Sequence, residues 1–238
     1  MIRIAWSISL CLFVVGLLCL NPPSRAQLTV MGVGGGFGGA AAAGGSAWGD
    51  KGTNVTLSTT TIANDTAANS SGVSAFSSVR GTQAYSSGKH YFEVKMITAP
   101  GSPLFIIGIM DNTTATGAAM DDTPNNIPNA CGNSMFNGNT FSVNWNGVNS
   151  GSWSLVDGDY MGVAVDSDNA FSYLALNNVY FLSGDPTSGA MGTGSVCSSV
   201  GAGARPMISI FNVAGSFQLR TTSSAFQGTL PTGYSAWN

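Results

Sequence analysis

Hydrophobic and polar positions alternate over short stretches from Trp48 onward, and no stretch has the 3.6-residue period of a helix. The hydrophobic runs are rich in Val, Ile, Phe, Tyr and Thr, and clusters of Gly, Asn, Asp and Pro separate them, as is typical of strands and turns. Ten strands are predicted, at residues 55–60, 73–79, 90–97, 104–110, 140–145, 160–166, 171–177, 179–182, 207–213 and 217–222. Ten such strands imply an all-β fold, a two-sheet antiparallel β-sandwich.

One strand shows the alternation with particular clarity. Successive side chains in a strand point to opposite faces, which divides this stretch into two sets: His90, Phe92, Val94 and Met96, and Tyr91, Glu93 and Lys95. The first set is predicted to face the core, with His90 half-buried at the end of the strand. The second set is predicted to be a solvated face, where Glu93 and Lys95 contact water.

Two connections are too long for simple turns, at residues 111–139 and 183–205. Connections of this length in a compact β domain usually carry function, so we expect them to form a binding rim at one edge of the sandwich. By contrast, Asn146-Gly147 predicts a tight hairpin, because both residues tolerate a positive φ.

The candidate binding residues lie in the first long connection and just beyond it: Asp121, Asp122, Asn125, Phe136, Trp145 and Trp153. Trp145 and Trp153 are interpreted first as core aromatics and second as a platform on which a ligand stacks.

The amino-terminal residues resemble an export signal. Arg3 supplies a positive charge, an apolar run follows to Leu20, and Ser24-Arg25-Ala26 provides small residues before a cut. The expected organisation is a signal peptide at residues 1–26, a Gly/Ala-rich linker at 27–47 and the sandwich domain at 48–238. An uncleaved membrane anchor is the alternative. After cleavage we expect no membrane insertion and a secreted, extracellular or cell-surface location, or the periplasm.

Charge narrows the class of partner. The whole chain has a net charge of −3, and removing Arg3 and Arg25 leaves six basic and 11 acidic residues, a net charge of −5. No basic cluster remains, which excludes a nucleic-acid partner. Only 8% of residues are charged, so the surface suits an uncharged glycan or another protein.

Two cysteines remain after signal cleavage, Cys131 and Cys197, one in each long connection. In an oxidising compartment they can form a disulfide that ties the two connections together, and two separate buried thiols are the alternative. Neither cysteine has a CxxC or Cys/His neighbourhood, so no metal site is predicted.

Few groups are available for catalysis. His90 and Glu93 are the only histidine and the only glutamate, and residues three apart in a strand point to opposite faces. Two pairs of carboxylates have the spacing that a glycosidase needs, namely Asp157 with Asp159 and Asp166 with Asp168, yet both flank turns. Asp166-Ser167-Asp168-Asn169 is a fragment of a calcium loop that lacks the later glycine and glutamate, so a polar turn is preferred. We expect no enzyme activity and no cofactor.

Three motifs in order resemble the SPRY domain, a concanavalin A-like jelly-roll sandwich: Gly88-Lys89-His90-Tyr91-Phe92-Glu93-Val94 with Ile107-Gly108-Ile109, Gly158-Asp159-Tyr160-Met161-Gly162-Val163-Ala164-Val165-Asp166 with the run to Asn177-Asn178, and Arg205-Pro206-Met207-Ile208-Ser209-Ile210 with Gly215-Ser216-Phe217. The ending Leu230 to Trp237 is more similar to bacterial and bacteriophage members. The resemblance implies binding without catalysis through loops at one end of the sandwich, and it carries over no binding residue.

The sequence therefore predicts an exported, non-enzymatic binding module for a protein or glycan. Two alternatives stay open. In the first, the chain is a structural subunit of a virion or surface filament, in which copies assemble through the Gly/Ala-rich arm. In the second, it is a carbohydrate-active enzyme on a similar sandwich.

Overall fold

The computed structural model of the chain describes residues 46–57, 66–69, 76–98, 105–111, 113, 116–121, 130–136, 140–143, 148–152, 155–190, 203–211 and 216–238. All of them belong to one compact unit, Gly39–Asn238. The expected signal peptide and residues 27–45 of the expected linker lie outside the described residues.

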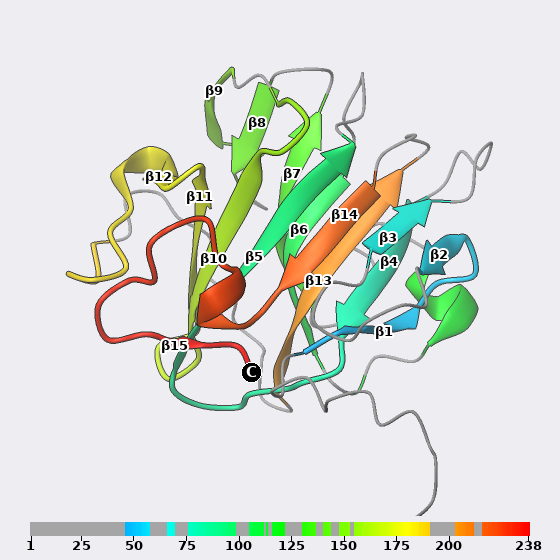
Figure 1. Cartoon of the computed structure of the whole chain (residues 1–238), viewed down its shortest axis with the longest axis horizontal. Coiled ribbons are helices and arrows are strands. Elements are labelled where there is room, and N and C mark those ends of the chain that lie inside the picture. Colours follow the sequence, from blue (N-terminus) through cyan, green and yellow to red (C-terminus); the bar gives the residue numbers. More distant parts are fainter. Residues whose placement is uncertain are drawn as a thin grey trace, which may run out of the picture. The chain divides into compact units, whose positions relative to one another are not determined.

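Two antiparallel sheets make up this unit (Figure 1), which confirms the predicted all-β sandwich. The first sheet has the order β1-β4-β13-β6-β7-β8-β9, and the second has the order β12-β11-β10-β5-β14-β3-β2, with β15 added beside β5. The strands are β1 (Trp48–Lys51), β2 (Val55–Leu57), β3 (Thr66–Asn69), β4 (Phe76–Gly81), β5 (Lys89–Thr98), β6 (Phe105–Asp111), β7 (Ala130–Phe136), β8 (Thr140–Val143), β9 (Val148–Ser152), β10 (Tyr160–Asp166), β11 (Phe171–Leu176), β12 (Val179–Tyr180), β13 (Ala204–Phe211), β14 (Ser216–Arg220) and β15 (Ser235–Ala236). Three short 3₁₀ turns accompany them: η1 (Gly117–Met120), η2 (Phe181–Ser183) and η3 (Ser223–Ala225).

Each of the ten predicted strands has a counterpart, and the structure adds five strands that were not predicted, namely β1, β3, β7, β9 and β15. The strand predicted at 179–182 ends at Tyr180, because the chain turns into η2 there. The connection predicted at 111–139 contains β7, which pairs with β6 from Ala130 to Met135. Its sequence, Ala-Cys-Gly-Asn-Ser-Met-Phe, has no alternation, and it is held by pairing with a buried neighbour. The first long connection is therefore residues 112–129.

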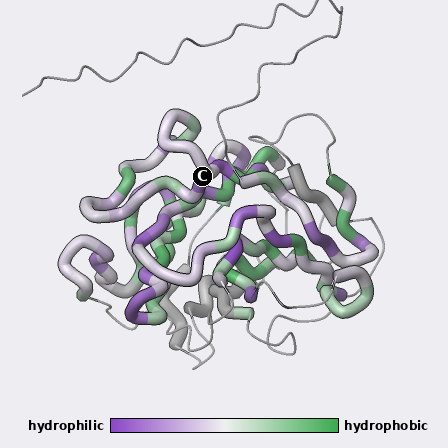
Figure 2. The backbone as a smooth tube through the Cα atoms, turned by 90° about the horizontal axis from the view of Figure 1, so that it is seen from below, coloured by the Kyte–Doolittle hydropathy of each residue, from purple (hydrophilic) through white to green (hydrophobic). Residues whose placement is uncertain are grey.

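The space between the sheets holds the main core. Phe92, Val94 and Met96 of β5 are fully buried there, as the alternation predicted, and Trp237 from the end of the chain packs with them. His90 is half-buried at the start of the same face, also as expected. Figure 2 shows hydrophobic and hydrophilic stretches close together along the described backbone.

The outer face of the second sheet is also covered, contrary to the prediction of a solvated face. Glu93 is 0% exposed and Tyr91 is 1% exposed, while Lys95 is half-buried. The chain after β14 crosses this face, drawn in red in Figure 1, and its side chains pack against the tyrosines of the sheet. A third layer, which contains η3 and is otherwise mostly irregular, therefore lies on β5, β10 and β11.

Candidate functional site

The first long connection leaves the first sheet at the same end of the sandwich at which the second long connection enters it. Asp111, the last residue of β6, pairs with Ala204, the first residue of β13. Ala204 also exchanges backbone hydrogen bonds with Tyr85, at N–O distances of 2.7 and 2.9 Å. The connection that leaves β6 and the connection that enters β13 are thus neighbours where they join the sheet. This end, which we call the connection end, is where the sequence analysis predicted the binding rim.

Asp121 directly follows η1 in the first long connection. Its carboxylate is hydrogen-bonded to other parts of the fold. It accepts hydrogen bonds from the backbone N–H of Thr53 at 3.0 Å, from the Thr53 hydroxyl and from the Ser77 hydroxyl. Burial acts to raise the pKa of Asp121, but these hydrogen bonds outweigh it and hold the pKa below its ordinary value. Met120 beside it is fully buried against the first sheet, so this segment anchors the connection to the sandwich.

The other predicted binding residues are only partly placed. Asp122, Asn125, Trp145 and Trp153 lie outside the described residues. Phe136 is described through its backbone, as the last residue of β7. β7 starts at Ala130 near the connection end and runs away from it. Phe136, its last residue, therefore lies at the far end of the strand.

The proposed disulfide stays a prediction. Cys131 is the second residue of β7 and pairs in register with Ile109, two residues before the end of β6. Its backbone therefore lies near the connection end, and Cys197 lies outside the described residues.

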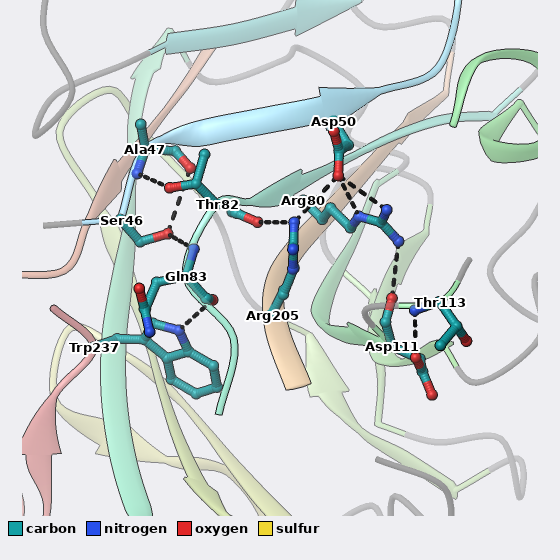
Figure 3. A network of polar contacts seen from close by, with 11 residues as sticks. Ser46, Ala47, Asp50, Arg80, Thr82, Gln83, Asp111, Thr113, Arg205 and Trp237 are labelled. Atoms are coloured by element: carbon teal, nitrogen blue, oxygen red, sulfur yellow. Dashed lines mark hydrogen bonds and ion pairs between the residues drawn. The ribbon is translucent and has the colours of Figure 1, made fainter. Parts of the chain in front are cut away.

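A charged cluster that sequence reasoning missed lies near the connection end (Figure 3). One carboxylate oxygen of Asp50 on β1 accepts from Nε and a terminal nitrogen of Arg80 on β4, at 3.1 and 2.9 Å, and from Arg205 on β13 at 3.2 Å. Arg80 also donates to the carbonyl of Asp111 at 2.9 Å. Burial lowers the pKa of Arg205, the like charge of Arg80 acts in the same direction, and Asp50 opposes both. The cluster joins neighbouring strands of one sheet, and its members are too far apart in sequence to show a local motif.

The carboxylates of the glycosidase alternative are engaged in turns. Asp159 accepts from the Val156 N–H and from the Asn177 side chain, both at 2.8 Å. Asp168 accepts from the Gly88 N–H at 2.9 Å, which links the turn after β10 to the start of β5.

Asp166 has a similar framework role at the other end of that turn. It accepts from the backbone and side chain of Asn169, at 3.1 and 2.9 Å, and pairs with Lys89 at 3.2 Å. Burial acts to raise the pKa of Asp166, and the hydrogen bonds from Asn169 together with Lys89 lower it overall. A charged Asp166 that closes a hairpin turn agrees with the polar-turn interpretation of this segment.

Among the described carboxylates discussed so far, Glu93 is the most deeply buried. Its oxygens accept from the backbone N–H groups of Gln227 and Gly228, each at 2.8 Å, and from the Tyr91 hydroxyl at 3.1 Å. Arg220 lies 4.0 Å away. Burial raises the pKa of the Tyr91 hydroxyl, and the charge of Glu93 raises it further. Glu93 therefore fastens the third layer to the sheet, a role suited to a charged acceptor of several donors.

Metal binding and membrane crossing find no support in the part of the chain that the structure describes. No group of three or more His, Cys, Asp or Glu side chains there is placed to hold a metal ion. No described helix is long and apolar enough to cross a membrane.

Comparison with known proteins identifies the fold. No protein-family model matches the chain, and no curated protein matches its sequence. A crystal structure of a human SPRY domain is similar with a TM-score of 0.50 and 13% identity, over 70% of this chain and 94% of that chain. The SPRY domain of human HERC1 has a TM-score of 0.43 and 11% identity over the same shares. The chain therefore has a SPRY-like, concanavalin A-like β-sandwich fold. Its bacterial or bacteriophage character stays a prediction.

Proposed function

We propose that this domain is an exported, non-catalytic interaction module that binds a protein or a glycan at the connection end. The observation that supports the proposal is the pairing of Asp111 with Ala204, which puts the start of the first connection beside the end of the second. Binding residues are commonly found on loops that a rigid scaffold positions in this way. The fold is compatible with this role, since it is the fold of SPRY domains.

The use of the ionisable side chains supports a role without catalysis. Glu93, Asp121, Asp159 and Asp166 each accept hydrogen bonds from groups of the framework, and each has at least one backbone N–H among its donors. A general acid or base must be within reach of a substrate and able to exchange its proton. Carboxylates committed to several fixed donors are poorly suited to that task.

The chemistry of the surface favours a neutral partner. With 8% charged residues, the chain has little capacity to attract a strongly charged ligand over a distance. Amide, hydroxyl and aromatic groups of the connections are the groups that bind a glycan or a polar protein surface. Secretion or display at the cell surface is part of the proposal, and it rests on the signal-like sequence at residues 1–26.

The test replaces part of the first connection. Residues 122–129 are exchanged for a short Gly-Ser turn, while η1 and Asp121 are kept because Met120 and Asp121 anchor the segment. The matched control makes the same exchange at residues 99–104, between β5 and β6, at the opposite end. The immobilised variants are assayed on a glycan array and for capture from the surface fraction of the producing cells.

We expect the first variant to lose capture and the control to retain it, with the thermal midpoint of both close to that of the parent. Undiminished capture by the first variant, or loss in the control alone, would contradict the proposal.

A further inference from the structure

The last residues of the chain complete the second sheet beside the start of β5. Strand β14 ends at Arg220, and β15 takes the place next to β5 that β14 leaves, with Ser235 opposite His90 and Ala236 opposite Tyr91. The Trp237 N–H then donates to the Tyr91 carbonyl at 2.9 Å, and its indole N–H donates to the Gln83 carbonyl at 3.0 Å (Figure 3). Trp237 is 0% exposed. This closing segment, residues 233–238, is thus inserted into the core by one large side chain and held by few backbone bonds.

His90 is clamped between an aromatic ring of the body and one of the closing segment. Its ring stacks on Tyr85 at a centroid distance of 3.6 Å and 16° between planes, and meets Trp237 edge-on at 5.6 Å. Tyr85 in turn meets Trp237 at 5.4 Å and donates from its hydroxyl to the main-chain oxygen of Asn238. The three rings form one unit, so the state of the imidazole affects how the closing segment is held.

The hydrogen bonds of His90 indicate which nitrogen titrates. Nε2 lies 3.2 Å from the carbonyl of Ser87, which only accepts, so Nε2 carries the proton of the neutral ring. Nδ1 is buried and has no hydrogen-bond partner. A second proton would therefore place a charge in a buried position, and the cost of that burial outweighs the nearby carbonyls that favour the charged form.

The groups around His90 oppose this effect only in part. The carboxylate of Asp168 and the carbonyls of Ser87 and Ala236 favour the charged form, but burial is the largest influence, and the pKa of His90 lies below its ordinary value. Lys89, the adjacent cation, is paired with Asp166 and lies 5.6 Å from the ring centre of Tyr234. The neutral imidazole is thus the form that fits the closed arrangement.

We propose that His90 is a pH-sensitive latch, and that its protonation releases the closing segment from β5 and withdraws Trp237 from the core. Release would free Gln83 and remove one ring from Tyr85, whose backbone pairs with Ala204 at the entry to β13. Acidification therefore loosens the connection end, which extends the proposed function to a control of binding by pH. The latch itself does not depend on that function.

The sign and size of the effect follow from linkage. The pKa of His90 is lowered in the closed form, so closure is fully stable above the ordinary histidine pKa of about 6.5 and loses stability as the pH falls through it. The opening constant is the ratio of the open to the closed form. It rises about tenfold for each pH unit over which only the open form takes up a proton. Between pH 7.5 and 5.0 we expect an increase of roughly three- to tenfold in opening.

The second attachment of the third layer provides an internal control. Gln227 and Gly228 bind Glu93, and no histidine lies there, since His90 is the only one in the chain. Hydrogen exchange of the intact chain is measured at pH 7.5 and 5.0 and corrected for the intrinsic rates. The amides of residues 235–238 should exchange three- to tenfold faster at pH 5.0, and those of Gln227 and Gly228 should not change.

A titration that needs no variant accompanies the exchange experiment. The imidazole C2 proton of the sole histidine gives one NMR signal, and its midpoint should lie below the ordinary histidine pKa of about 6.5. In H90Q the pH response of residues 235–238 should disappear, while D168N, which removes a carboxylate that favours protonation, should move the imidazole midpoint to lower pH. Equal exchange at both pH values, slower exchange at pH 5.0, or an imidazole midpoint above the ordinary value would overturn the latch.

Discussion

Two carboxylates that pair with arginine have opposite surroundings in this domain. Glu93 on the second sheet is 0% exposed, and the chain after β14 closes over it. Asp50 on the first sheet accepts from Arg80 and Arg205, but its own side chain is 40% exposed. Both sites join elements that are distant in sequence, and only the first is sealed from water.

The difference lies in the donors that satisfy each charge. Glu93 receives backbone N–H groups of Gln227 and Gly228, so its charge and the position of the third layer depend on each other. Among the described residues, the donors to Asp50 are the guanidinium groups of Arg80 and Arg205, and its side chain is in part open to solvent. A sealed carboxylate is expensive to leave unsatisfied, whereas an exposed one is screened by salt and water. The two sites should therefore respond very differently to substitution.

The largest effect is expected for Glu93→Ala. This change leaves the N–H groups of Gln227 and Gly228 without their acceptor beneath the third layer and removes the charge that lies 4.0 Å from Arg220, and we expect the free energy of unfolding to fall by about 3–5 kcal/mol. Glu93→Gln keeps the volume but offers one acceptor oxygen in place of two, so its loss should be smaller. Urea unfolding at neutral pH measures both. A loss below about 1 kcal/mol in Glu93→Ala would mean that the buried Glu93 and the partly exposed Asp50 do not differ in their contribution to stability.

Arg80→Met should have the next largest effect. Arg80 is 4% exposed, and its methylene groups would be replaced by a side chain of similar length, while its hydrogen bonds to the Asp111 carbonyl and to Asp50 would be lost. We expect a loss of about 1.5–3 kcal/mol, typical of a hydrogen bond that involves a charged group. The unfolding free energy of Arg80→Lys serves as control, because it keeps the charge and loses the planar fork. If Arg80→Met is as stable as the parent, the hydrogen bonds of Arg80 to Asp50 and Asp111 do not contribute to stability.

Asp50→Asn should have a smaller effect that depends on salt. Because the Asp50 side chain is partly exposed, we expect a loss of about 0.5–1 kcal/mol at low ionic strength, and the loss should shrink at 1 M salt. The loss in Glu93→Ala should persist at the same salt concentration. Unfolding curves at low and high NaCl measure the two losses. A loss in Asp50→Asn that does not depend on salt would contradict the claim that the Asp50 charge is exposed to solvent.

The smallest effect concerns Asp121 in acid. Its pKa is lowered in the folded protein, so its contribution to stability is present above the ordinary aspartate pKa of about 3.9 and is lost as the pH falls through the folded-state value. Parent and Asp121→Asn should therefore differ near neutral pH and converge in strong acid. Thermal midpoints across this range measure the convergence. A constant difference at all pH values would mean that the charge of Asp121 is irrelevant.

Local patterns predicted the strands well where the apolar run is long. The strand predicted at 160–166 coincides with β10, whose nearly continuous apolar run is buried at every position. β7 was missed because its small and polar residues have no period, and its position depends on pairing with β6. Pairing of this kind is a property of the neighbouring strand and leaves no local signal.

The candidate site was harder to predict because its contacts are long-range. Glu93 has the sequence position of a solvated residue, and the residues that bury it follow 134 and 135 positions later. Asp121 was expected to bind a ligand, yet its donors Thr53 and Ser77 lie 68 and 44 positions away. The scarcity of glutamate was the one signal available, since a single glutamate in a chain of few charges invites a structural interpretation.

The most direct test of the account is the hydrogen exchange of the Gln227 and Gly228 amides in the intact chain at neutral pH. If the buried Glu93 carboxylate holds the third layer on the sheet, both amides should exchange at least about a thousandfold more slowly than in an unstructured peptide, and Glu93→Ala should abolish this protection. Exchange near the peptide rate in the parent, or unchanged protection in Glu93→Ala, would contradict the claim that this carboxylate serves the framework.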